Sequence, residues 1–76
     1  MKELLEILQG IKPGVDFENE QGLVEKGILD SMAMIRLVSE IGDEFDVEIK
    51  VTDLVPENFN SAEAIMSLIE RLEDED

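Results

Sequence analysis

The 76-residue chain contains neither cysteine nor histidine. Without cysteine it forms no disulfide and no thiolate zinc site. Without histidine it lacks the usual general base near neutral pH and the commonest metal ligand. A chain this short also buries only about 60% of its unfolded surface, so its hydrophobic core is thin. We therefore expect one small domain that performs no chemistry with its own side chains.

Basic residues are also scarce, with 6 Lys and Arg against 20 Asp and Glu, a net charge of −14. This charge repels nucleic-acid phosphates and anionic membrane surfaces, and it favours basic protein partners. No apolar run is long enough to span a membrane, and no signal-peptide pattern opens the chain. Hydrophobic residues still make up 43%, enough for a globular core. We expect a cytoplasmic monomer with its domain over residues 1–72 and an acidic frayed tail over 73–76.

The spacing of apolar residues predicts an all-α fold, a small antiparallel bundle of three main helices plus one short helix. The main helices are predicted over about Lys2–Gln9, over Ser31–Phe45, and from Asn60 onward. Asp30 or Ser31 is the expected N-cap of the second. Asn60 and Glu63 resemble a capping box at the start of the third. The predicted core comes from two stripes: Met34, Leu37, Val38, Ile41 and Phe45, and Ala62, Ile65, Met66, Ile69 and Leu72.

The segments between the helices are less regular. The loop over Ile11–Asp30 is unusually long for a compact domain, which is typical of a functional loop or of one held by its own side chains. Its expected anchors are Phe17, Leu23, Val24, Ile28 and Leu29, with one helical turn from Gly22 closed by Gly27. Val47–Val51 alternates like a strand but has no partner, so we expect an extended connector that touches the core through Val47, Ile49 and Val51. Thr52–Phe59, which contains Pro56, is expected to form a short turn or a single helical turn.

The motif Leu29-Asp30-Ser31-Met32 opens the clearest helix, and it has two interpretations. In the simpler one, Asp30-Ser31 is only an N-cap. In the other, Ser31 carries a phosphodiester, because the free N–H groups and the positive dipole at a helix N-terminus favour an anion. The serine also follows a long loop, where a modifying enzyme could reach it.

Taken with its surroundings, this motif resembles the acyl carrier proteins over nearly the whole chain. The matching features are Leu29-Asp30-Ser31-Met32, the stretch Glu44-Phe45-Asp46-Val47-Glu48-Ile49, the long first loop, a short third helix and the strong acidity. The resemblance implies that Ser31 carries 4'-phosphopantetheine, added from coenzyme A by a phosphopantetheinyl transferase that recognises Asp30. It further implies that the prosthetic thiol holds an acyl or aminoacyl group as a thioester.

Within this family the chain departs from carriers of fatty-acid synthesis, because Ala33 and Arg36 stand where acidic residues are expected. The run Gly27–Met32, and Asp53–Phe59 followed by Asn60-Ser61, look more like D-alanyl carrier proteins and related stand-alone carriers. The implied partner is an adenylating ligase, with a synthase or transferase of fatty-acid or polyketide pathways as the alternative.

Residues near the motif are candidates for partner binding: Met32, Ile35, Arg36, Glu40, Asp43, Glu44, Glu48 and Ile49. Met32 and Ile35 lie off the core stripe and are the expected exposed apolar contacts, although Ile35 could instead be buried against Thr52–Phe59. Arg36 could simply pair with Glu40 at i+4. The acidic residues could meet a basic partner or form only a solvated face.

Two other functions fit part of the sequence. An acidic helical adaptor that binds a basic protein without modification explains the charge, but not the serine at the helix start or the long loop. A calcium-binding helical protein is less well supported, because no EF-hand spacing begins at any of the candidate aspartates.

Overall fold

The computed structural model describes residues 1–75, and over this part of the chain it is all-helical, without a strand. Its elements are α1 (Lys2–Ile11), α2 (Ser31–Phe45), the 3-10 helix η1 (Val51–Asp53), α3 (Pro56–Phe59) and α4 (Ala62–Asp74). The predicted fold of three main helices plus one short helix is therefore confirmed. None of the described helices combines the length and the apolar character that a membrane crossing requires.

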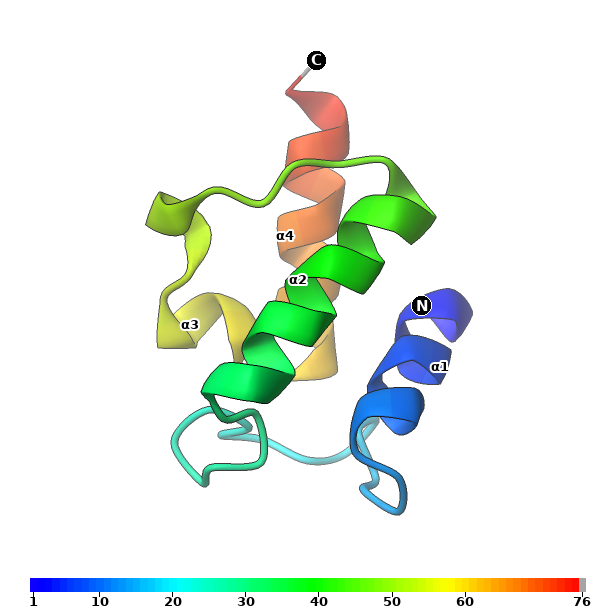
Figure 1. Ribbon diagram of the computed structural model, residues 1–76, viewed down its shortest axis with the longest axis vertical. Coiled ribbons are helices and arrows are strands. Elements are labelled where there is room, and N and C mark those ends of the chain that lie inside the picture. The colour runs from blue at the N-terminus through cyan, green and yellow to red at the C-terminus, as the bar shows by residue number, and fades with distance from the viewer. Residues whose placement is uncertain (76) are drawn as a thin grey trace.

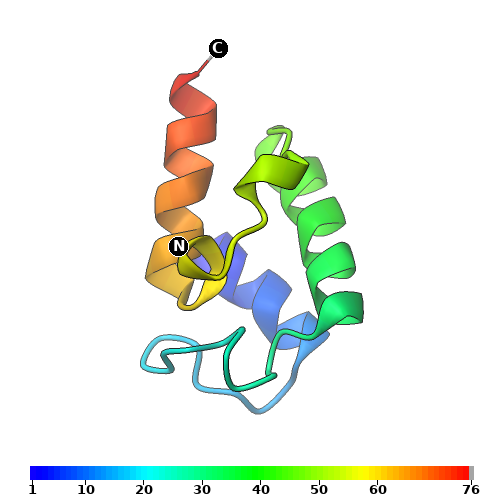
Figure 2. The same ribbon diagram turned by 90° about the vertical axis from the view of Figure 1, so that its left-hand side faces the viewer.

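The helices form a bundle whose two ends differ. α1 packs against α2 and α4, and α3 packs against α4. α1 runs in the opposite direction to α2 and α4 (Figures 1 and 2). The long loop between α1 and α2 closes the end of the bundle where α2 and α4 begin, whereas the connection that follows α2 lies at the other end (Figure 1). Ser31 therefore lies at the loop-covered end.

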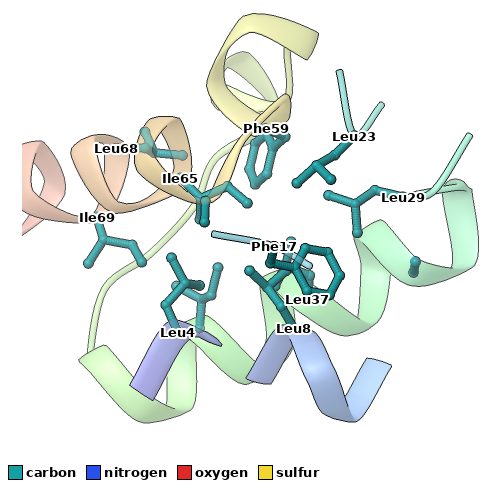
Figure 3. Close-up of a cluster of buried hydrophobic side chains, with 13 residues drawn as sticks. Leu4, Leu8, Phe17, Leu23, Leu29, Leu37, Phe59, Ile65, Leu68 and Ile69 are labelled. Carbon is teal, nitrogen blue, oxygen red and sulfur yellow. The ribbon is translucent and has the colours of Figure 1, made fainter. Parts of the chain in front are cut away.

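One apolar cluster joins all four helices and the long loop (Figure 3). Its largest fully buried side chains are Leu4, Leu8, Phe17, Leu23, Leu37, Ile41, Phe59, Ile65, Leu68 and Ile69. Of the predicted loop anchors, Phe17, Leu23 and Leu29 are buried, and Val24 and Ile28 are partly buried against the cluster. The buried stripes differ from the prediction. Ala33 and Leu68 join the core. Five predicted members are only partly buried: Met34, Val38, Phe45, Met66 and Leu72.

Two predicted helix ends are wrong. α1 continues through Gly10 to Ile11, because the packing of Leu8 outweighs the roughly 1 kcal/mol by which glycine disfavours a helix. α4 begins at Ala62, and its N-cap is Ser61, whose hydroxyl accepts a hydrogen bond from the Ala64 N–H at 3.0 Å. Asn60 ends α3 instead, and its side chain is bound to the long loop.

The segment after α2 is extended and unpaired, as predicted, but only part of it meets the core. Val47 and Ile49 are partly buried against the core cluster. The prediction that Val51 touches the core is wrong: its side chain is 83% exposed, because the chain turns into η1 there and the alternation ends. At the other end of the chain, α4 is helical through Asp74, two residues into the predicted frayed tail, whose last residue, Asp76, lies outside the described residues.

Candidate attachment site at the start of α2

The first turn of α2 is closed by Asp30, which settles the choice between the two candidate caps. Asp30 has extended backbone angles, and its Oδ1 accepts a hydrogen bond from the Ala33 N–H at 2.9 Å. Its carbonyl oxygen accepts from the Met34 N–H at 2.8 Å. Ser31 is therefore the first residue inside the helix, one position after the cap.

Ser31 differs from the other three serines in its surroundings. Its side chain is exposed, and within residues 1–75 no hydrogen bond engages its hydroxyl. Ser61 is 9% exposed and its hydroxyl is committed to capping α4. Ser39 and Ser67 are exposed but lie inside α2 and α4, away from a helix N-terminus. Only Ser31 offers a hydroxyl where free N–H groups and the helix dipole favour a bound anion.

The loop that leads into Ser31 is ordered by its own hydrogen bonds. A single turn forms where the Lys26 N–H donates to the Gly22 carbonyl oxygen at 2.8 Å. Gly27 then takes a φ of +77°, a backbone conformation that glycine adopts without strain, and ends the turn as predicted. The Leu29 N–H donates to the Leu23 carbonyl oxygen at 2.9 Å, and both side chains are buried. The cap and the serine therefore follow a segment that is fixed to the core.

Two open depressions flank the start of α2, and Ile35 borders both. The one on the α3 side has a volume of about 390 Å³, and its mostly apolar lining includes Ser31, Met34, Leu54 and Pro56. The other, on the α1 side, has a volume of about 380 Å³. Its lining is more polar and contains Lys12, Asp30 and Arg36. Ser31 therefore borders an apolar surface on one side and lies next to charged groups on the other.

The predicted partner-binding residues fall into two separate groups. Met32 and Ile35 are 75% and 67% exposed beside Ser31, so burial of Ile35 against the segment over 52–59 is wrong. Arg36 donates from Nε to Glu40 Oε2 at 3.0 Å, the alternative that its i+4 spacing offered. The guanidinium has five N–H donors, so others remain for a partner.

The remaining candidates lie far from the serine. Asp43 and Glu44 are exposed at the opposite end of α2, and twelve residues of helix place Asp43 about 18 Å from Ser31 along the axis. Glu48 is exposed on the connection that follows. Ile49 is partly buried and packs on the core, so it contributes less surface than its sequence position indicated.

Sequence reasoning missed two residues near the site. Lys12, the C-cap of α1, places its Nζ 4.0 Å from Asp30 Oδ2. Leu54 is 42% exposed and lines the apolar depression beside Ser31. No periodicity relates these positions to Ser31. Ala33 is only 6% exposed. Of the two residues that depart from the acidic pattern of fatty-acid carriers, only Arg36 therefore lies on the surface.

A small helical bundle with one exposed serine at a helix N-terminus, flanked by an apolar depression, is the architecture of a carrier domain. The prosthetic group of such domains fits the residues present: a phosphodiester at Ser31 would meet the dipole of a 15-residue helix, and Lys12 supplies a cation nearby. The apolar lining beside Ser31 suits the less polar part of the group.

Comparison with known proteins gives the same result. Residues 2–72 match the family described as "Phosphopantetheine attachment site", and the chain belongs to this family. It is 31% identical over 78 residues to a D-alanyl carrier protein of Lactococcus lactis subsp. lactis, covering 99% of both chains. It is 27% identical over 77 residues to a D-alanyl carrier protein of Lactobacillus delbrueckii subsp. bulgaricus, covering 99% of this chain and 95% of that one. No solved structure gave a significant match. The cofactor of the family is 4'-phosphopantetheine, and its members are carriers rather than catalysts.

Proposed function

We propose that Ser31 is the attachment point of 4'-phosphopantetheine, and that the domain over residues 1–72 carries an acyl or aminoacyl group between partner enzymes. The observation that supports this most directly is the exposed, unengaged Ser31 hydroxyl in the first turn of α2. The cofactor supplies a thiol that holds the cargo as a thioester. The protein's part is to position the serine, present a docking surface and hold the tethered cargo at a high local concentration.

The attachment is tested by incubating the protein with coenzyme A and a phosphopantetheinyl transferase and measuring its intact mass. We expect a gain of one phosphopantetheine group, and no gain for Ser31→Ala. Ser39→Ala is the matched control, because Ser39 is exposed on the same helix, and it should gain the same mass as the native protein. An unmodified native protein, or a modified Ser31→Ala variant, would contradict the assignment and favour an acidic adaptor that works without modification.

We propose D-alanine as the cargo, loaded by an adenylating ligase. This rests on the similarity to D-alanyl carrier proteins over 99% of the chain and on the near-neutral surface beside Ser31, where Arg36 replaces an expected acid. The phosphopantetheinylated protein is incubated with ATP, a D-alanine-activating ligase and labelled D-alanine. The label should become protein-bound and be released by hydroxylamine. Loading of a fatty acid by an acyl ligase, without loading of D-alanine, would assign the protein to another pathway.

The docking surface comprises Met32, Ile35 and Arg36 near the serine, with the more distant candidates Glu40, Asp43, Glu44, Glu48 and Ile49. Acidic groups that meet a basic enzyme speed association more than they tighten it, and salt screens them. Reversing the charge of Glu40 and Asp43 together should therefore slow modification and flatten its dependence on salt. Reversal of Glu70, which is exposed on α4, is the control. Rates equal to those of the control would make the distant acids a solvated face only.

A further inference from the structure

Asn60, which ends α3, is bound to the long loop through two of its oxygens. Its carbonyl oxygen accepts a hydrogen bond from the Leu23 N–H at 2.9 Å. Its side-chain Oδ1 accepts one from the Val24 N–H at 3.1 Å, and this second bond is partly buried. The two partners are consecutive residues 36 or more positions away in sequence. One residue thus fixes the first turn of the segment that leads to Ser31.

The connection from Asn60 to the serine runs through backbone hydrogen bonds and buried side chains. Leu23 passes the constraint to Leu29, whose N–H donates to the Leu23 carbonyl oxygen at 2.9 Å. The side chains of Leu23 and Leu29 are buried beside Phe59, the neighbour of Asn60 (Figure 3). Leu29 is followed directly by Asp30, the cap of α2, and then by Ser31. A displacement of the turn at Leu23 would therefore also displace Leu29, and with it the cap and the serine that follow directly in sequence.

The same bonds join the two walls of the apolar depression. Val24, Leu29 and Ser31 line one wall, and residues 54–56 line the other. Within residues 1–75, the two bonds to Asn60 are the hydrogen bonds between the loop before α2 and the segment over 54–60. These hydrogen bonds are directional, whereas hydrophobic attraction has no preferred direction, so the bonds to Asn60 add a specific register to the apolar packing of the two walls.

We infer that Asn60 is a positioning residue: through Leu23 and Val24 it holds Ser31 and the α3 wall of the depression in the arrangement that a partner enzyme engages. This inference rests on the proposed attachment at Ser31. Asn60 touches neither the serine nor the cofactor, so its effect is on the placement of the hydroxyl in the enzyme complex. A misplacement of about 1 Å at a reacting centre can cost about a hundredfold in rate.

The test compares Asn60→Ala with Asn60→Asp under a phosphopantetheinyl transferase and coenzyme A. Alanine removes the Oδ1 acceptor, whereas aspartate keeps an acceptor for the Val24 N–H. We expect Asn60→Ala to lower kcat about tenfold or more, with a smaller change in KM, and Asn60→Asp to restore most of the rate. Gln21→Glu, on an exposed residue beside the same turn, controls for the added charge. Asn19→Ala controls for loss of an asparagine in the loop, because its side chain bonds only locally to Asp16.

All rates are measured below the melting transition of the least stable variant, so that each protein is folded. A folded Asn60→Ala variant modified at the native rate would overturn the inference, as would Asn60→Asp being as slow as Asn60→Ala. Both results leave the proposed function intact, because that function fails only if the native protein is not modified at Ser31.

Amide hydrogen exchange tests the hydrogen bonds on which the inference rests, and its measurement on the native protein does not depend on whether Asn60→Ala folds. In the native protein the Val24 N–H should be protected and the exposed Gln21 N–H should not. In a folded Asn60→Ala variant the protection of Val24 should fall more than that of Leu23, whose acceptor is the backbone of residue 60. Exchange of the native Val24 N–H at the rate of an unprotected loop would contradict the inferred role.

Discussion

Replacement of Asp30 tests whether its carboxylate holds the start of α2. The carboxylate has three interactions to lose: the cap bond to the Ala33 N–H at 2.9 Å, the attraction to the helix dipole, and the ion pair with Lys12 at 4.0 Å. A lost N-cap costs typically about 1 kcal/mol, and the dipole about 0.3–1 kcal/mol. The ion pair is long, and the side chains of Asp30 and Lys12 are 58% and 40% exposed, so the pair contributes little to the stability of the fold.

A matched pair of variants isolates the cap. Asp30→Asn and Asp30→Ala both remove the negative charge, and both relieve the same repulsion in a chain of net charge −14. Asparagine is as good an N-cap as aspartate, whereas alanine is a poor one. The two variants should therefore differ by about 1 kcal/mol, which shifts the melting temperature of a domain this size by about 4–8 °C.

Thermal unfolding followed by far-UV circular dichroism measures this difference directly. Asp30→Ala should melt about 4–8 °C below Asp30→Asn. Ser61→Ala is a control for cap loss, because the Ser61 hydroxyl makes the same kind of bond at the start of α4, and it should show a drop of similar size. Equal melting temperatures for the two Asp30 variants would show that the carboxylate does not cap α2 and would refute the reasoning.

Further predictions concern packing, glycines and charge. Leu37→Ala should cost about 2–5 kcal/mol in denaturant unfolding because Leu37 is fully buried, whereas Ile35→Ala, on the same helix but 67% exposed, should change stability by less than about 0.5 kcal/mol. Gly10→Ala should stabilise the protein by up to about 1 kcal/mol, since Gly10 is helical with open space around it. Gly27→Ala should destabilise by about 1–2 kcal/mol because of its φ of +77°. Added salt should raise the melting temperature by screening self-repulsion, and a melting temperature independent of salt would contradict this.

The sequence was most informative where one short-range pattern dominated. The bounds of α2 were predicted correctly because its apolar spacing persists over the whole of Ser31–Phe45. The cap of α4 was assigned to Asn60 rather than Ser61 because both residue types suit a cap. The deciding interaction, the bond from Val24 to Asn60, spans 36 residues and leaves no local pattern. The exposure of Val51 was missed for a related reason, since alternation does not reveal where a strand-like segment turns into a 3-10 helix.

The residues of the candidate site likewise fall into those that the local sequence predicts and those that only the tertiary structure brings to the site. The cap at Asp30 was predictable from a local motif, because capping acts within one turn, whereas the attachment at Ser31 was predicted from the family resemblance of the motif and its surroundings. Lys12 and Leu54 reach the site through tertiary packing and could not be found from their own neighbours in sequence. The total charge was also a poor guide to the α1 side of the start of α2, where Arg36 and Lys12 line a depression together with Asp30 in an otherwise acidic chain.

The most direct test of the attachment site is peptide mapping of the protein after reaction with coenzyme A and a phosphopantetheinyl transferase. Tandem mass spectrometry should place one phosphopantetheine group on the peptide that contains Leu29-Asp30-Ser31-Met32, on the Ser31 oxygen. A group found on Ser39, Ser61 or Ser67, or no group at all, would contradict the assignment of Ser31 as the point from which this domain carries its cargo.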